Sequence, residues 1–227
     1  MKNYILTNTS FVNDAGITLY QLKVKRDFLH YKKGELHGWI SSEFLINGTL
    51  RIKDDAQVSG NAQVYGNAWV SRDARVYGNA QVYGNAWVYG DARVYGNAQV
   101  YGDARVYGNA RVYGNAWVSG NAQVSGDARV YGNAWVYGDA QVYGNARVSG
   151  NAQVYGDAWV KSPLQIQGSK HFINMITRDS LKIGCKILTL IEWKKQFKTI
   201  GIENKYTKEE IKEYKSYIDL AISLYKK

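Results

Sequence analysis

The sequence predicts an all-β solenoid with a small α+β cap, specifically a left-handed triangular parallel β-helix, and three observations lead to it. Alanine recurs at every sixth position from Ala56 to Ala158, 18 times without a break. Valine recurs in the same way from Val58 to Val160, and residues two apart on a strand share a face, so both side chains point inward. The variable positions repeat with a longer period of 18 residues, as a coil of three six-residue units requires.

Each six-residue unit is one short strand followed by one corner. It reads Asn/Asp-Ala-x-Val-Tyr/Ser-Gly, where x is Gln, Arg or Trp. The x and Tyr/Ser positions flank Val and therefore point outward. Gly followed by Asn or Asp is typical of a turn, because these residues tolerate positive φ. We call the sides of the coil that begin at Gln57, Gln63 and Trp69 the first, second and third sides.

Residues 1–37 predict an N-terminal β cap in front of the solenoid. Residues 17–24 alternate enough for a strand, and residues 28–31 are expected to complete a hairpin with it. Such a cap blocks the open sheet edge that the first coil would otherwise expose.

Residues 38–166 predict the solenoid itself, with about seven coils. Ile40, Ile46 and Ile52 continue the Val phase backwards by one degenerate coil, and Ile166 is in phase beyond the last unit. The corner before the second side is Asn in every coil from Asn61 to Asn151, which predicts a ladder of stacked amides joined by hydrogen bonds.

Residues 167–227 predict a β-hairpin followed by two helices. The hairpin joins residues 171–178 to residues 181–188 and places Cys185 inside a strand as a small buried residue. Thr189 with Glu192, and Thr207 with Glu210, have the spacing of capping boxes that start helices. The first helix is expected to end at Gly201. The second has an apolar face made of Ile211, Tyr214, Ile218, Ala221, Ile222 and Tyr225.

The net charge of +10 belongs to the ends of the chain, since residues 55–160 contain 7 Arg and 7 Asp. This neutral stretch disfavours mimicry of duplex nucleic acid, and we expect no duplex partner. The single Cys185 excludes an internal disulfide. No run of 18 apolar residues and no apolar signal core occurs. We therefore expect a protein in the cytoplasm of a bacterial host cell, without membrane contact.

Stacking of residues one coil apart produces columns of like side chains on the outer sides. The first side carries an Arg column with a Tyr column beside it, and Arg is suited to phosphate and carboxylate recognition. The candidate ligand-binding residues are Arg75, Arg93, Arg111, Arg129, Arg147, Tyr77, Tyr95, Tyr113 and Tyr131. Two other interpretations stay open. The Arg column packs against another subunit, or it is structural, with Arg stacked on Tyr and partly neutralised by Asp73, Asp91 and Asp127.

Outward-facing aromatic residues leave apolar area exposed, which favours self-association, and we expect a trimer. The candidate interface combines the third side with the last helix. Its residues are Trp69, Trp87, Trp159, Tyr214, Ile218 and Tyr225.

Residues at both ends resemble a phage and prophage family of hexapeptide-repeat proteins that are often labelled as transferases. The N-terminal resemblance covers Leu19-Tyr20, Lys32-Lys33-Gly34-Glu35-Leu36 and Gly38-Trp39-Ile40-Ser41-Ser42-Glu43. The C-terminal resemblance covers Ile183-Gly184-Cys185, Thr189, Glu192 and Trp193. The resemblance implies a phage-type accessory protein that counters host defence, and it implies no reaction. Two positions depart from the family: His37 replaces a Gly, and Leu188 replaces a His that would form a Cys-x-x-His pair.

No catalytic residue, metal ligand or cofactor is expected, because residues 55–160 contain no His, Cys or Glu. His30, His37 and His171 lie outside the regular coils. The Ala and Val interior leaves no room for a ligand, so binding has to use the sides, corners or ends. The sequence therefore predicts a non-enzymatic binding protein for a host protein or an anionic, nucleotide-like ligand. A structural rod or spacer and a hexapeptide-repeat acyltransferase remain alternatives.

Overall fold

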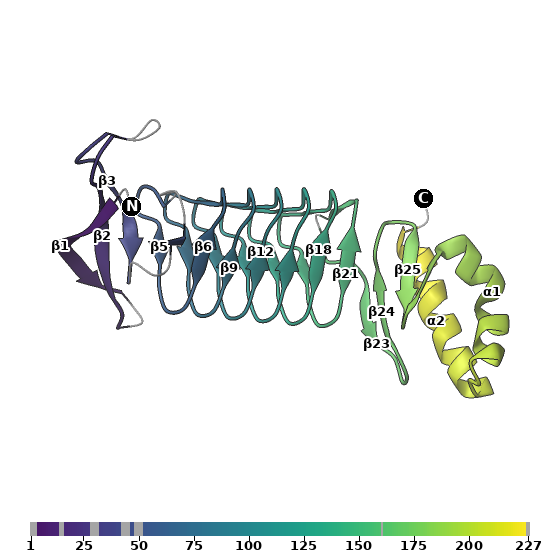
Figure 1. The fold of residues 1–227 in the computed structure, drawn as a ribbon. Coiled ribbons are helices and arrows are strands. Elements are labelled where there is room, and N and C mark those ends of the chain that lie inside the picture. Colours follow the sequence, from purple (N-terminus) through teal and green to yellow (C-terminus); the bar gives the residue numbers. More distant parts are fainter. Residues whose placement is uncertain are drawn as a thin grey trace.

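The computed structural model describes residues 4–13, 16–27, 32–41, 46–47, 52–159 and 161–225. Within these residues the chain forms a β-solenoid of about six turns between an N-terminal β cap and a C-terminal cap of strands and helices (Figure 1). The predicted all-β solenoid with a small cap is thereby confirmed. The left-handed winding stays a prediction.

Parallel sheets form the three sides of the described coils, as the 18-residue period requires. The first side contains β5 (Gln57–Val58), β8 (Arg75–Val76), β11 (Arg93–Val94), β14 (Arg111–Val112), β17 (Arg129–Val130) and β20 (Arg147–Val148). The second contains β6 (Gln63–Tyr65), β9 (Gln81–Val82), β12 (Gln99–Val100), β15 (Trp117–Val118), β18 (Trp135–Tyr137) and β21 (Gln153–Tyr155). The third contains β7 (Trp69–Val70), β10 (Trp87–Val88), β13 (Arg105–Val106), β16 (Gln123–Val124), β19 (Gln141–Val142) and β22 (Ala158–Trp159).

The repeated alanines and valines fill the interior of the solenoid. From Ala56 to Val154 each of them is at most 3% exposed. At the corner before the second side, each Asn amide nitrogen donates to the amide oxygen of the Asn one coil further, at 3.0–3.2 Å. The predicted Asn ladder from Asn61 to Asn151 is confirmed. The interior is thus occupied by small side chains, and the outer sides, corners and ends remain for contacts with other molecules.

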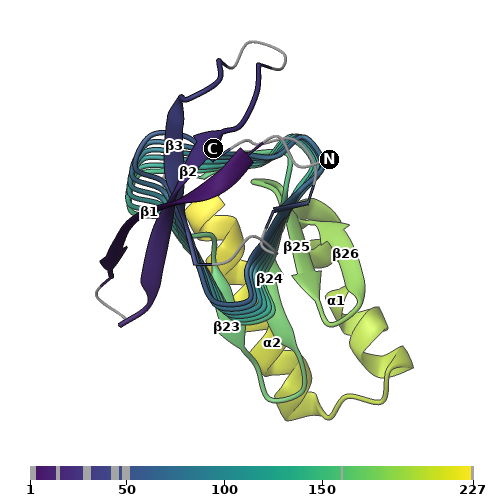
Figure 2. The same ribbon diagram turned by 60° about the vertical axis from the view of Figure 1, so that its left-hand side comes forward.

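The N-terminal cap extends the sheet of the first side. Its strands are β1 (Tyr4–Val12), β2 (Thr18–Val24) and β3 (Leu36–Ile40). β1 pairs antiparallel with β2, β2 pairs antiparallel with β3, and β3 pairs parallel with β5. Figure 2 shows these strands across the end of the coils. The strand predicted over residues 17–24 is confirmed as β2, and it pairs with β1, a strand that the sequence did not predict. Residues 28–31, which include His30, lie outside the described residues.

The degenerate first coil follows the predicted phase. Ile40 pairs with Val58, Ile46 of β4 (Ile46–Asn47) pairs with Val64, and Ile52 forms an isolated bridge with Val70. Each isoleucine therefore stands in the Val position of its side. Phe44 and Leu50, expected in the Ala phase, lie outside the described residues.

The register shifts by one residue in the last coil. Val142 pairs with Trp159, 17 positions further on, whereas Val124 pairs with Val142, 18 positions further on. Trp159 therefore occupies an inward position and is 3% exposed, in edge-to-face contact with Tyr225 at 6.0 Å between ring centroids. The prediction that Trp159 lies on the outer third side is wrong. Because the Ala/Val core ends here, the indole supplies the apolar volume that closes it.

An antiparallel sheet follows the last coil, with β23 (Gln165–Gln167), β24 (Phe172–Met175), β25 (Ser180–Ile183) and β26 (Lys186–Thr189) in that order. Ile166 was expected to continue the solenoid, but it lies in β23 and pairs antiparallel with Ile173. The strand predicted over residues 181–188 is divided, because Gly184 adopts a φ of +60° and turns the chain between β25 and β26. Cys185 is exposed in this turn, so its predicted burial in a strand is wrong.

Helices α1 (Leu190–Glu203) and α2 (Lys208–Tyr225) complete the cap and begin at the predicted capping boxes. The Glu192 N–H donates to Thr189 Oγ1 at 3.2 Å, and the Glu210 N–H donates to Thr207 Oγ1 at 3.1 Å. Among the described helices, none combines the length and the apolar character needed to cross a membrane.

α1 continues through Gly201, which was expected to end it. Gly201 is buried, and a Cβ there would lie 2.7 Å from Ile211 Cγ1 of α2. The missing side chain lets the two helices approach each other closely, so this glycine serves packing rather than termination.

Candidate functional site

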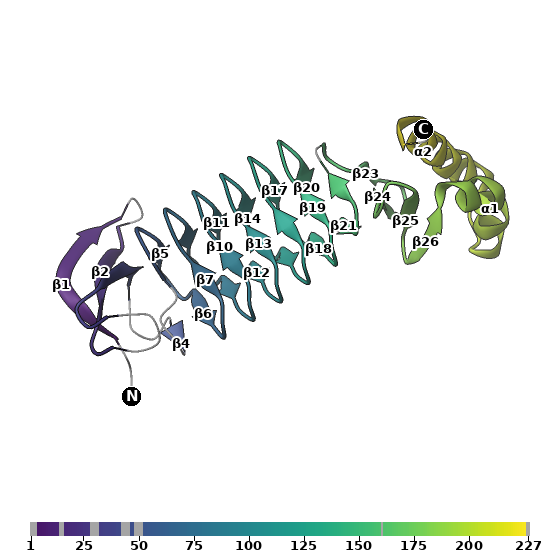
Figure 3. The same ribbon diagram turned by 90° about the horizontal axis from the view of Figure 1, so that it is seen from above.

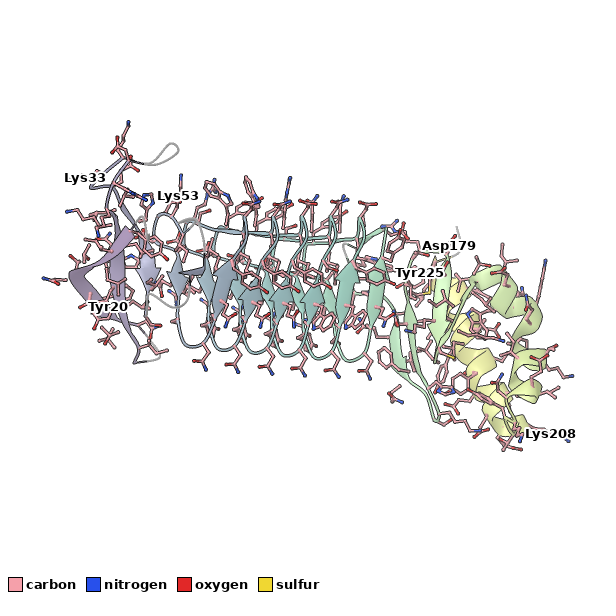
Figure 4. The ribbon with its side chains drawn as sticks, in the orientation of Figure 1. Tyr20, Lys33, Lys53, Asp179, Lys208 and Tyr225 are labelled. Atoms are coloured by element: carbon pink, nitrogen blue, oxygen red, sulfur yellow. The ribbon has the colours of Figure 1, made fainter. Side chains whose placement is uncertain are left out.

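The first side brings the candidate ligand-binding residues together in two neighbouring columns. The arginines are paired in register from one coil to the next, and the tyrosines two positions later stack ring on ring. We call this surface the Arg/Tyr side; it consists of Arg75, Arg93, Arg111, Arg129, Arg147, Tyr77, Tyr95, Tyr113 and Tyr131. Figure 3 shows β11, β14, β17 and β20 following one another along the solenoid, and Figure 4 shows side chains projecting from the coils in regular rows.

The tyrosine rings of the Arg/Tyr side are stacked nearly parallel. Successive ring centroids from Tyr77 to Tyr131 are 4.8, 4.9 and 5.0 Å apart, with interplanar angles of 2° to 3°. Each ring therefore covers the face of the next. Burial raises the pKa of the Tyr77, Tyr95 and Tyr113 hydroxyl groups, although nearby guanidinium groups oppose the shift. These hydroxyl groups stay protonated at neutral pH and are available as hydrogen-bond donors.

Four arginines of this column have no carboxylate partner among the residues that the structure describes. Among the described residues, no ion pair within 4.0 Å involves Arg93, Arg111, Arg129 or Arg147. The same four guanidinium groups make no cation–π contact with a described ring. The Tyr-stacking and Asp-pairing contacts of the structural interpretation are therefore not formed at these four positions, and partial neutralisation by Asp at longer range stays open. Like charges in directly opposed positions destabilise a sheet, so an anion bound along the column would relieve that repulsion.

A cleft of about 450 Å³ lies at the N-terminal end of the Arg/Tyr side. One wall is formed by Asn13 and Ile17, which flank the connection between β1 and β2. The Ile17 N–H donates to the Asn13 side-chain oxygen at 3.0 Å, which fixes this wall. The remaining lining residues belong to the first coils: Gln57, Ser59, Gly60, Arg75, Tyr77, Gly78 and Arg93.

A second cleft of about 430 Å³ lies at the opposite end of the Arg/Tyr side, against the C-terminal cap. The Arg147 N–H donates to Ser162 Oγ, and Gln165 Nε2 donates to the Arg147 carbonyl oxygen, both at 2.9 Å. Tyr131, Ser149 and the cap residues Pro163, Leu164, Leu224 and Tyr225 complete the lining. The Arg/Tyr side is thus a strip that ends in a cleft at each cap. Sequence reasoning missed these clefts, because the repeat does not reveal where the caps lie.

The third side contains a second aromatic cluster with cations at its ends. The rings of Trp69 and Trp87 stack at 5.8 Å between centroids. Lys53 Nζ lies 4.9 Å from the Trp69 ring centroid, and the Arg105 guanidinium carbon lies 5.9 Å from that of Trp87. Trp87 is 47% exposed, so this cluster remains on the surface.

Three of the candidate interface residues lie in the interior. Trp159 closes the core, and Tyr214 and Ile218 are 4% and 1% exposed, because the apolar face of α2 packs within the C-terminal cap. Tyr225 is half-buried, and its hydroxyl oxygen accepts a hydrogen bond from the Leu164 N–H at 3.0 Å. Of the six candidates, the tryptophans Trp69 and Trp87 keep the outward position that an interface requires.

The titratable groups that the structure describes outside the Arg/Tyr side do not meet the requirements of a metal site. Within the described ranges, no group of three or more His, Cys, Asp and Glu side chains is placed to hold a metal ion.

His171 and Cys185 line a cavity of about 70 Å³ together with apolar residues of α1 and α2. His37 is buried beside Glu35, with 3.5 Å between Nε2 and Oε2. Burial lowers the pKa of His37, although the Glu35 carboxylate opposes the shift.

Comparison with protein families identifies the repeat. The YdcK beta solenoid repeat model matches nine segments, namely residues 56–72, 62–78, 74–90, 80–96, 86–102, 98–110, 104–120, 122–138 and 140–156. A comparison with curated proteins found no match. The matched segments span the coils that carry the Arg/Tyr side. The chain therefore contains, between residues 56 and 156, a β-solenoid repeat similar to the YdcK beta solenoid repeat.

Proposed function

We propose that this chain is a non-enzymatic binding protein that holds an anionic ligand, or an anionic segment of a partner protein, along the Arg/Tyr side. One observation carries the proposal: an in-register Arg column in which Arg93, Arg111, Arg129 and Arg147 have no carboxylate partner among the described residues. Planar guanidinium groups bind carboxylates and phosphates through paired hydrogen bonds. The adjacent Tyr hydroxyl groups add donors along the same line.

The charge distribution of the solenoid supports this position for the ligand. Residues 55–160 carry equal numbers of Arg and Asp, so attraction of an anion depends on where the charges lie. Five of the 7 arginines of these coils stand in one column. An anion that lies along the column contacts several of them at once, and its attraction is screened by salt.

The biological setting in this proposal comes from the resemblance to phage hexapeptide-repeat proteins. The chain acts as an accessory factor in the cytoplasm of an infected bacterial cell, where capture of a host molecule counters a defence. We place self-association, as a trimer, on the tryptophans of the third side, which leaves the Arg/Tyr side accessible. Light scattering tests this part, since a concentration-independent mass of 25.6 kDa would contradict it.

Retention on immobilised heparin, used as a general polyanion, tests the proposed binding side. Replacing Arg93→Glu together with Arg111→Glu reverses two charges in the centre of the Arg column. Replacing Arg72→Glu together with Arg105→Glu changes the net charge by the same amount on other parts of the coils, where these arginines lie over the Tyr89 and Trp87 rings.

We expect the column variant to elute at a clearly lower salt concentration than the matched variant. Equal elution of the two variants would show that the Arg column is not the binding side. If the column variant and the unmodified protein eluted at the same salt concentration, the rod or spacer function would be favoured. Far-UV circular dichroism of all three proteins controls for folding.

A further inference from the structure

The ligand class follows from the spacing and orientation of the groups on the Arg/Tyr side. We infer that this side binds an acidic α-helix of a partner protein, which lies along the solenoid axis with its carboxylates over the Arg column. The inference rests on the proposed function, and it narrows the anionic ligand to one kind of protein surface.

Between Tyr77 and Tyr131 the tyrosine column offers no free ring faces for stacking. Proteins that bind single-stranded nucleic acid use such faces as platforms for bases. Stacked bases are about 3.4 Å apart, so a base inserted between two rings needs a gap of about 7 Å. The rings from Tyr77 to Tyr131 are 4.8–5.0 Å apart and cover one another. The column therefore presents ring edges and hydroxyl groups, which suit carboxylates better than bases.

The spacing of the arginines matches a helix better than other peptide conformations. Each coil advances by the 4.8–5.0 Å measured between tyrosine rings, and a helix with one acidic residue per turn advances about 5.4 Å. The mismatch over the four intervals from Arg75 to Arg147 is about 2 Å, which flexible Arg and Glu side chains can span.

An extended strand places the side chains of one face about 6.7 Å apart. Over the same four intervals, its side chains and the arginines would differ in position by about 7 Å. A polyproline II helix advances about 9.3 Å per turn, so it can meet only every second arginine. Neither conformation aligns one carboxylate with each arginine of the column.

The two end clefts set the length of the segment. Four coil intervals correspond to about 19 Å, which is about 13 residues of α-helix at 1.5 Å per residue. At the two ends of that distance, Asn13 and Ile17 share a cleft with Arg75, and residues 162–165 share a cleft with Arg147. A helix of about four turns therefore fits between the caps.

Two synthetic peptides of identical composition test the inference. Each has about 15 residues, which is about four helical turns, is capped at both termini and is rich in Ala. In one peptide five Glu at i, i+4, i+7, i+11 and i+14 form a single stripe, whereas in the other they are spread around the helix. Binding is followed by fluorescence anisotropy with the unmodified protein, the column variant and the matched variant described above.

We expect the striped peptide to bind at least about tenfold more tightly than the spread peptide, because several weak pairs act together. The preference should disappear in the column variant and persist in the matched variant. Arg93→Gln with Arg111→Gln provides a second column variant should the two glutamates disturb folding.

Failure of the inference is distinguishable from failure of the proposed function. Equal binding of both peptides through the Arg column would overturn helix recognition and leave the proposed function intact. Helix recognition would also be wrong, and the proposed function intact, if neither peptide bound while heparin retention still depended on the Arg column. Tighter binding of a single-stranded oligonucleotide than of the striped peptide would lead to the same conclusion. If neither peptide binds and heparin retention is independent of the column, both are wrong.

Discussion

The corner glycines provide a quantitative test of how tightly the coils are stacked. Gly96 has a φ of +71°, and a Cβ at this position would lie 3.0 Å from the Gly114 nitrogen and 3.2 Å from its carbonyl oxygen. That oxygen accepts a hydrogen bond from the Asn97 N–H at 2.8 Å, so the neighbouring backbone is not free to move. Gly156 has a similar φ of +75°, but a Cβ added there would have no described atom within 4 Å. Gly156→Ala is therefore a matched control for Gly96→Ala.

Both substitutions carry the cost of a side chain at positive φ, and only Gly96→Ala adds a close contact with the backbone of the next coil. A non-glycine residue at positive φ costs about 1–2 kcal/mol, and the stiffer unfolded chain offsets about 0.4–1 kcal/mol of this. We expect Gly156→Ala to lower the free energy of unfolding by about 1 kcal/mol. Gly96→Ala adds a steric cost of about 1–3 kcal/mol and should lose about 2–4 kcal/mol in total.

Urea denaturation followed by far-UV circular dichroism measures both free energies of unfolding. Hydrogen exchange of the Asn97 amide shows whether the loss arises at the predicted corner. Equal losses for the two variants would refute the reasoning, because they would show that the backbone of one coil does not restrict the corner of the next.

Two further predictions concern the ends of the solenoid. Burial holds the pKa of His37 below its ordinary 6.5. As the pH falls through 6.5, the unfolded state therefore takes up a proton before the folded state does, and stability is lost below that value. The melting temperature of the unmodified protein should fall more between about pH 7.5 and 5.5 than that of His37→Gln, and equal falls would contradict this. Trp159→Ala should lower the free energy of unfolding by about 3–5 kcal/mol. Trp135→Ala should lower it clearly less, because the Trp135 side chain is 40% exposed. Equal losses in urea denaturation would mean that Trp159 does not close the core.

The sequence predicts the solenoid well because its constraints are local and repeated. An inward Ala and Val in every unit determine which side chains are buried, and the 18-residue period determines which outward residues share a column. The register of Arg93 with Arg111 follows from these two facts. The Asn ladder follows from the same period.

The exceptions depend on tertiary contacts that a repeat does not encode. The six-residue pattern continues through Val160, so nothing in it signals that Trp159 turns inward to close the core. Gly201 has the residue type that ends helices, but its position against Ile211 makes it a packing residue. The end clefts of the Arg/Tyr side depend on the placement of both caps, which no spacing within the chain predicts.

The most direct test of anion binding along the Arg/Tyr side is chemical modification of arginine with phenylglyoxal, read by mass spectrometry with and without a heparin fragment. Anion binding on that side predicts selective protection of the column, whereas the other arginines react at an unchanged rate. Protection of Arg72, Arg105 or Arg178 instead, or uniform protection of all arginines, would contradict it. The residues expected to be protected are Arg75, Arg93, Arg111, Arg129 and Arg147.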